Sequence, residues 1–119
     1  MKIIVTSSGE KPESPVDPRF GRAAKFMVYD TASDQYETVD NVQNLHAAQG
    51  AGIQAAETAA RLEADCVLTG HCGPKAFMVL KTAGVKVYTG VEGTVADAVA
   101  RFKSGELNPA EGADVEGHW

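Results

Sequence analysis

The sequence predicts one α/β domain with a mixed five-stranded sheet (three antiparallel strands, then αβαβα with parallel strands) and flanking helices. The first observation is length, because 119 residues are too few for two separate hydrophobic cores. The second is the N-terminal half, which holds three strand-like runs, two of them arranged as a hairpin. The third is the C-terminal half, where helical and strand patterns alternate. Such alternation demands parallel strands joined by right-handed crossovers.

The first half of the chain predicts the antiparallel strands. Residues 2–7 are rich in β-branched side chains, which suit a sheet. Residues 8–24 contain three prolines and form a loop of about 17 residues; loops beyond ~12–15 residues are usually functional or disordered. Residues 25–30 and 35–40 are strand-like runs on either side of a turn at 31–34, as in a β-hairpin.

The second half predicts the helices and the parallel strands. An alanine-rich stretch places polar side chains on one face only, which indicates an amphipathic helix packed closely on the sheet. Pro74 opens the next helix and Gly84 ends it. In order, we expect a linker at 41–52, a helix at 51–64, a strand at 65–69, a turn at 70–73, a helix at 74–83, a strand at 85–89, a turn at 90–93 and a helix at 94–103.

The last residues differ from the rest in composition. Residues 106–119 contain four acidic residues and neither Lys nor Arg. We therefore expect the folded domain to occupy residues 1–104, and residues 105–119 to form a mobile acidic tail.

Composition excludes several classes of protein. Eleven basic against sixteen acidic residues give a net charge of −5, which argues against binding to a nucleic-acid backbone. No apolar run approaches the ~20 residues that a membrane span needs. The first residues read as a strand and not as a signal peptide, so we expect a cytoplasmic protein. Cys66 and Cys72 do not make a disulfide scaffold, and their spacing misses the Cys-x2-Cys pattern of zinc sites.

The candidate binding site is a rim of the sheet. Ligands of open α/β sheets bind beyond the carboxyl ends of the parallel strands. The loops at 7–22, 70–74 and 90–93 follow such strands, so we expect all three on one rim. The loop at 44–52 can reach the same rim. It carries His46, which is either a surface residue or a metal ligand.

The segment Gly-His-Cys-Gly-Pro at 70–74 is the most informative short motif. Its glycines let the backbone approach a ligand, and the N–H groups and dipole of the helix that follows favour an anion. A plain strand-to-helix turn would need the same glycines and proline. Cys72 lies where a thiol pKa should fall, so it is either a thiolate ligand or nucleophile or an incidental reduced thiol. Cys66 lies in an apolar strand and is expected in the core.

The segment Asp-Pro-Arg-Phe-Gly-Arg at 17–22 is the main positive feature near the rim. Arg19 and Arg22 offer several directed donors to anions that present many oxygens or sulfides. Phe20 is expected to supply an apolar wall. The alternative is a solvated loop with a structural acid–arginine pair.

Enzymatic functions have less support from the sequence. His71 and Cys72 are adjacent in sequence, which normally points their side chains apart, so a Cys–His hydrolase is disfavoured. Asp30 and Asp40 end antiparallel strands and cannot gather with Asp17 for two-metal chemistry. Neither Gly-x4-Gly-Lys-[Ser/Thr] nor Gly-x-Gly-x2-Gly occurs, so the usual nucleotide cradles are missing.

A set of motifs resembles a known family. The set comprises Val-Asp-Pro-Arg-Phe-Gly-Arg-Ala (16–23), a helix entered through Gly50 and Gly52, Thr-Gly-x-Cys-Gly-Pro-Lys-Ala-Phe (69–77), Ala-Gly-Val-Lys-Val-Tyr (83–88) and Gly-Thr-Val-x-Asp-Ala-Val (93–99). Over residues 1–104 the chain resembles the dinitrogenase iron–molybdenum cofactor-binding family (the NifX, NafY and NifB C-terminal type), and most of all its small stand-alone members.

This resemblance implies a ribonuclease-H-like fold without catalysis and carriage of an anionic metal–sulfur cluster. The cluster would be a molybdenum–copper sulfide held without covalent attachment, or an iron–molybdenum-type cluster. A sulfide cluster brings its own sulfur and so needs few protein thiolates. The alternative is a regulatory module that contacts a cytoplasmic ATPase of the Mrp/MinD type and binds no metal. The matching site residues are Arg19, Phe20, Gly21, Arg22, Gly70, Cys72, Gly73 and Pro74, and His71 is either an added ligand or a local replacement.

Overall fold

A computed structural model describes residues 1–41 and 50–113 of the chain. Its elements are β1 (Lys2–Ser7), β2 (Lys25–Asp30), β3 (Gln35–Asp40), α1 (Ala51–Arg61), β4 (Cys66–Leu68), α2 (Pro74–Thr82), β5 (Lys86–Tyr88) and α3 (Val95–Lys103).

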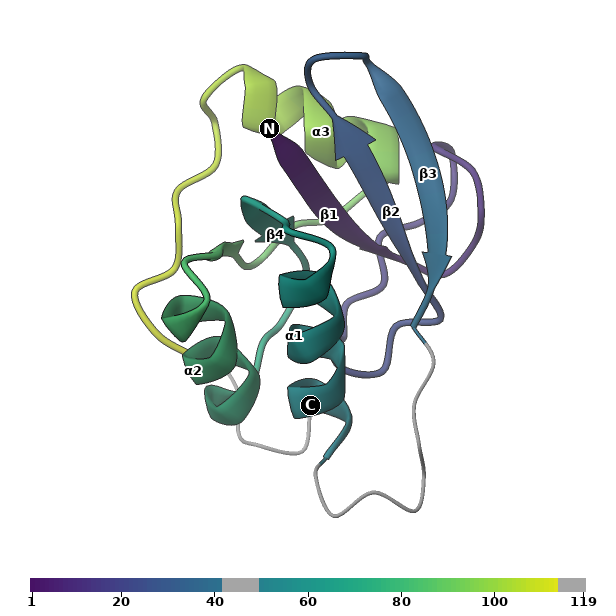
Figure 1. The fold of residues 1–119 in the computed structure, drawn as a ribbon. Coiled ribbons are helices and arrows are strands. Elements are labelled where there is room, and N and C mark those ends of the chain that lie inside the picture. Colours follow the sequence, from purple (N-terminus) through teal and green to yellow (C-terminus); the bar gives the residue numbers. More distant parts are fainter. Residues whose placement is uncertain (42–49, 114–119) are drawn as a thin grey trace.

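The strands form one mixed sheet in the order β3-β2-β1-β4-β5 (Figure 1). β2 pairs antiparallel with both β1 and β3. β4 pairs parallel with both β1 and β5. The predicted single domain with a mixed five-stranded sheet is therefore confirmed, including the change from antiparallel to parallel pairing at β1.

Helices cover both faces of the sheet, as Figure 1 shows. Because neighbouring side chains of a strand point to opposite faces, Ile4 of β1 lies in one core and Ile3 and Val5 lie in the other. The first core is completed by α1 and α2, and the second by α3. The result is a three-layer α/β/α arrangement, in which α1 and α2 share one face.

The observed helices and parallel strands are shorter than predicted. Helix α1 was expected to reach residue 64 but ends at Arg61. The reason is Glu63, which has a left-handed conformation with φ of 59°. The Ala64 N–H then donates to the Ala59 carbonyl (3.3 Å) and closes the helix end. Strands β4 and β5 are each one residue shorter at both ends than the predicted ranges 65–69 and 85–89.

Residues 105–113 run along the open edge of the sheet. Leu107 packs against the core on the α3 face, and Ala110 packs against the core on the α1 and α2 face. The Ala110 N–H donates to the carbonyl of Val87 in the edge strand β5 (2.7 Å). The domain boundary at residue 104 and the mobility of the tail stay predictions.

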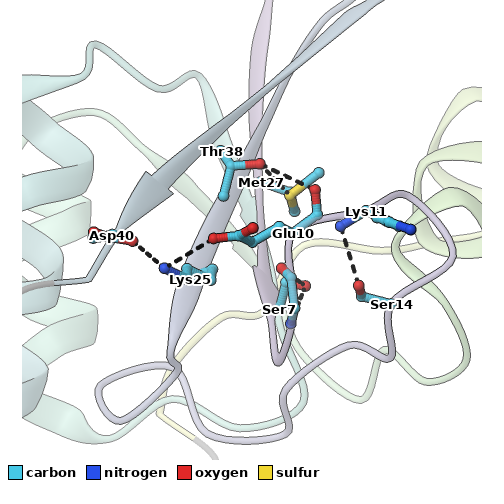
Figure 2. Close-up of polar contacts among 9 residues, drawn as sticks. Ser7, Glu10, Lys11, Ser14, Lys25, Met27, Thr38 and Asp40 are labelled. Atoms are coloured by element: carbon cyan, nitrogen blue, oxygen red, sulfur yellow. Dashed lines mark hydrogen bonds and ion pairs between the residues drawn. The ribbon is translucent and has the colours of Figure 1, made fainter.

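The loop after β1 folds back over the β2-β3 hairpin (Figure 2). The Lys25 ammonium forms ion pairs with Asp40 and with Glu10 (3.3 Å). Hydrogen bonds to Asp40 and then to Glu10 raise the pKa of Lys25 above its ordinary value. The Thr38 hydroxyl donates to the Glu10 carbonyl (3.2 Å). These contacts fix the start of the loop that carries the two arginines.

Among the described residues, no helix is both long enough and apolar enough to span a membrane.

Candidate functional site

Two segments predicted from the sequence lie side by side: the arginine loop (residues 17–22) and the helix-start turn (residues 70–74). The His71 N–H donates to the Pro18 carbonyl (2.7 Å), and the Phe20 N–H donates to the His71 carbonyl (3.1 Å). Arg19 and His71 thereby form a short parallel bridge. Two loops that are about fifty positions apart in the sequence become one surface.

Gly70 makes this close approach possible. A Cβ atom at this position would lie 2.7 Å from both the Cα and the carbonyl oxygen of Pro18. Side chains do not tolerate backbone atoms at that distance, so only glycine fits unless the arginine loop moves away. This is the close-approach role that glycine fills in many binding loops.

The turn at 90–93 joins the same rim. The Gly90 N–H donates to the Gly70 carbonyl (2.8 Å), and the Val16 N–H donates to the Gly93 carbonyl (2.9 Å). Below them, the buried Thr6 hydroxyl donates to the Asp17 carbonyl (2.8 Å) and lies 2.8 Å from the Thr69 hydroxyl. The prediction that the three loops share one rim is confirmed.

The arginine loop is held from inside and presents its cations outside. The Asp17 carboxylate accepts the Arg19 N–H (2.9 Å) and lies 3.8 Å from the Arg19 Nε. The acid–arginine pair of the alternative interpretation is therefore present, yet the Arg19 side chain stays 48% exposed, and Arg22 is exposed as well. Phe20 is fully buried and stacks on Phe26, with ring centroids 5.8 Å apart. It anchors the loop and has no exposed surface to offer as an apolar wall.

Helix α2 begins at the rim with its N-terminal amides uncapped by side chains. Gly73 is the N-cap and makes no side-chain cap bond, and Pro74 occupies the first turn. That turn contains no acidic residue. It contains Lys75 instead, which is exposed. A cation near a helix N-terminus opposes the helix dipole, so this arrangement lacks the usual local stabilisation and suits an external anion.

Helix α3 shows the contrasting arrangement. Thr94 and Asp97 form a capping box, in which each side chain accepts the backbone N–H of the other residue. The next two amides, of Val95 and Ala96, donate to the carbonyls of Ser14 (3.0 Å) and Pro12 (2.9 Å) in the loop that follows β1. The hydrogen bonds from Thr94 hold the pKa of Asp97 below its ordinary value. The N-terminus of α3 is thus satisfied within the protein, and that of α2 is not capped in this way.

The first turn of α1 adjoins the first turn of α2. A Cβ at Gly52 would lie 3.2 Å from the Cβ of Ala76, so the two helices begin in contact, and Figure 1 shows them side by side on one face of the sheet. The N-cap of α1 is Gly50, again without a side-chain cap bond or an acidic residue in the first turn. Parallel dipoles at one rim add to the positive potential there.

Both cysteines are buried. Cys72 has no exposed surface, and its Sγ lies 3.7 Å from the Gly73 carbonyl oxygen. Burial raises the pKa of the Cys66 thiol to about 12, which agrees with the predicted core role of Cys66. Across residues 1–41 and 50–113, no group of three or more His, Cys, Asp and Glu side chains could hold a metal ion. His71 is half-buried, and His46 lies outside the described residues.

Sequence reasoning missed two contributors to this site, Lys75 and Asn41, whereas the start of α1 falls in the loop at 44–52 that was expected to reach the rim. The side-chain NH2 of Asn41 donates to the carbonyls of Gly21 (3.2 Å) and Ala23 (2.9 Å), on either side of Arg22. For Lys75 a signal was available, because a lysine directly after the proline that opens a helix is electrostatically unfavourable. Asn41 gave no such signal, since a polar residue after a strand is ordinary.

Comparisons with known proteins agree with this geometry. The sequence profile of the family described as "Dinitrogenase iron-molybdenum cofactor" matches residues 1–105. The apo form of the orange protein from Desulfovibrio gigas is 45% identical, over 96% of this chain and 96% of its own, with a TM-score of 0.91. A Thermotoga protein provisionally assigned to NifB is 33% identical over 98% of both chains, with a TM-score of 0.81. An uncharacterized protein of Methanocaldococcus jannaschii is 26% identical over 98 residues, which span 81% of this chain and 83% of that protein.

Proposed function

The chain belongs to the dinitrogenase iron–molybdenum cofactor family, and from this membership we propose that it is a non-catalytic carrier of an anionic, molybdenum-containing metal–sulfur cluster. The observation that carries the proposal is the docking of the arginine loop onto the start of α2. It places Arg19 beside the helix-start turn, and the helix that follows this turn begins without a side-chain cap bond and with Pro74 and Lys75 exposed.

The chemistry of the rim suits a preassembled sulfide cluster. Such a cluster presents mainly sulfur at its surface and needs donors of hydrogen bonds and positive charge more than it needs open metal ligands. Arg19, Arg22 and Lys75 supply the charge, and the first turn of α2 supplies amides. Both cysteines are buried, which disfavours an iron–sulfur site built on several protein thiolates. We propose a molybdenum–copper sulfide as the cargo and an iron–molybdenum-type cluster as the alternative.

The remaining residues of the two loops act mainly through the backbone. Phe20 is buried and Gly21 is buried, so they hold the arginine loop in place. Gly70, His71, Gly73 and Pro74 shape the turn, and Cys72 contributes less than the arginines because its sulfur is covered. Each arginine contact is worth about 1.5–3 kcal/mol when partly shielded from water. Loss of both arginines should therefore weaken retention by roughly a hundredfold or more.

The test is reconstitution of metal-free protein with tetrathiomolybdate and a copper salt, followed by gel filtration and measurement of both metals. We compare wild type, the Arg19→Ala/Arg22→Ala pair, Cys72→Ser, and Arg61→Ala/Arg101→Ala. The last pair removes the same charge from the far ends of α1 and α3. We expect coloured wild type, Cys72→Ser and control protein, and strong loss only in the first pair.

Two results would contradict the proposal. Wild type that retains no metal above buffer controls would exclude a carrier role. Loss of the cluster in Cys72→Ser with retention in the arginine pair would mean that a thiolate, not the rim, holds the cargo.

A metal-free module that binds a cytoplasmic ATPase is the second candidate. One feature favours it: Met78 on α2 is 59% exposed, and with its neighbours on that helix it lines a shallow cavity of about 410 Å³. A spectrum of protein purified without added metal separates the two functions. Visible charge-transfer absorption supports the carrier, and colourless protein that binds the ATPase supports the module.

A further inference from the structure

Asn41 connects the end of β3 to the arginine loop. The residue is buried, with 9% of its surface exposed. The side-chain NH2 donates to the Gly21 carbonyl (3.2 Å) and to the Ala23 carbonyl (2.9 Å). Its backbone N–H donates to the Ala24 carbonyl (3.3 Å). One residue therefore satisfies the carbonyls immediately before and after Arg22.

The surrounding contacts fix the backbone of residues 20–23, here called the arch, and leave Arg22 as its exposed residue. On one side, Phe20 is fully buried against Phe26. On the other side, Ala23 is buried in the same core. Between them the Arg22 side chain is exposed. The hydrogen bonds from Asn41 complete the arch because they connect the carbonyls of Gly21 and Ala23 to the residue that follows β3.

The same asparagine has a feature that lowers stability. Its side-chain oxygen is buried and is the one such atom in the described residues that lacks a hydrogen-bond partner. A buried, unpaired carbonyl oxygen costs free energy. An apolar side chain of similar size would avoid that cost but could not hold the two carbonyls. The benefit of an amide at this position is therefore the fixed arch.

We infer that Asn41 is a positioning residue for cluster binding, which holds the backbone around Arg22 so that its guanidinium is presented at the rim. The inference rests on the proposed carrier function. A preorganised arginine loses less conformational freedom when it binds an anion, so the affinity rises without a new contact. The asparagine itself does not touch the cluster.

The experiment is a double-mutant cycle on tetrathiomolybdate–copper retention. Asn41→Ala should weaken retention about tenfold in wild type and in the Arg19→Ala background, and should have no further effect in the Arg22→Ala background, because it acts through Arg22. Asn41→Ser keeps one donor and should give an intermediate loss.

A second readout needs no cluster. In metal-free protein, the heteronuclear NOE of the Gly21, Arg22 and Ala23 amides should fall in Asn41→Ala and partly in Asn41→Ser. The amides of the opposite loop at 90–93 should keep wild-type values and serve as the internal control.

Several results would overturn the inference. These are equal retention by wild type and Asn41→Ala, equal further loss in the Arg22→Ala background, and unchanged NOE values at Arg22. Unfolding of both Asn41 variants would make the residue structural and would equally refute it. Wild type that retains no metal is a different outcome, because it refutes the carrier function itself.

Discussion

At the scale of single residues, Gly70 controls the distance between the arginine loop and the helix-start turn. Because a Cβ there would lie 2.7 Å from Pro18 backbone atoms, Gly70→Ala must push the loops apart. We expect a loss of about 1–3 kcal/mol in the free energy of unfolding, as for other overpacked sites, together with weaker cluster retention. Urea unfolding and metal analysis measure the two effects.

The control for this variant is Gly112→Ala, since a Cβ at Gly112 would have no atom of the described residues within 4 Å. The control should match wild type in both measurements. Retention by Gly70→Ala equal to that of the control would mean that contact between the two loops is irrelevant to binding.

Cys66 gives a pH-dependent prediction. Burial raises the pKa of its thiol from an ordinary value of 9.0 to about 12 in the folded protein. Between these values the unfolded chain loses the thiol proton and the folded chain keeps it. Stability therefore falls as pH rises from about 9 to 12, by up to about 1.4 kcal/mol per pH unit from this group. Urea unfolding of wild type and Cys66→Ala should show a shallower decline in the variant, and equal slopes would contradict the burial of the thiol.

The predictability of the site differs from residue to residue. Arg19, Arg22 and the turn around Gly70 could be predicted because strand order places the loops after parallel strands on one rim. Burial of Phe20 could not, since an aromatic residue between two arginines also fits a ligand wall. Asn41 was hidden for another reason: its partners are backbone carbonyls of a distant loop, which leave no pattern in the sequence.

At the scale of secondary-structure elements, we expect the N-terminus of α3 to contribute to stability and the N-terminus of α2 to contribute to binding. Helix α3 carries the Thr94–Asp97 capping box, and α2 begins at the rim without a side-chain cap. Thr94→Ala should lower the free energy of unfolding by about 1 kcal/mol, as is usual for a lost N-cap, and should leave cluster retention unchanged. A loss of retention would place α3 in the site.

A change at Asp97 tests the pH dependence of the same capping box. Hydrogen bonds from Thr94 lower the pKa of Asp97 below its ordinary 3.8. The stabilisation from the ionised carboxylate is therefore present above pH 3.8 and is lost as the pH falls through the folded-state value. The stability difference between wild type and Asp97→Asn should shrink toward pH 3 in urea unfolding. A difference that stays constant over this range would show that the ionised Asp97 carboxylate does not stabilise the helix start.

Element order was predictable and element ends were less so. The hydrophobic periodicity and the turn residues predicted every strand and helix, because glycine and proline mark most of the boundaries. The end of α1 lacked such a mark. Glu63 adopts the left-handed conformation that glycine usually takes at a helix end. Because a glutamate does not signal a helix end, the predicted helix extended to Ala64.

At the scale of the whole molecule, the sheet has two edges of different character. β3 forms one edge, and β5 forms the other. The short strand β5 is crossed by residues 107–110, which contact the cores on both faces of the sheet. Unpaired edges invite association with other strands. This covering segment could not be predicted, because residues 105–113 lack the periodicity of a strand or a helix.

Truncation of the chain tests this role. Removal of residues 105–119 eliminates the hydrogen bond from Ala110 to Val87 (2.7 Å) and the apolar contacts of Leu107. We expect a lower melting temperature and concentration-dependent self-association, measured by scattering after gel filtration, because the β5 edge becomes open. Removal of residues 114–119 alone is the matched control and should leave both properties as in wild type. Cluster retention should survive both truncations, since the arginine loop and the helix-start turn follow the inner strands β1 and β4 and not the covered edge strand β5. A monomer of unchanged stability after the longer truncation would show that the segment only rests on the sheet, and that the short length of β5 already protects this edge.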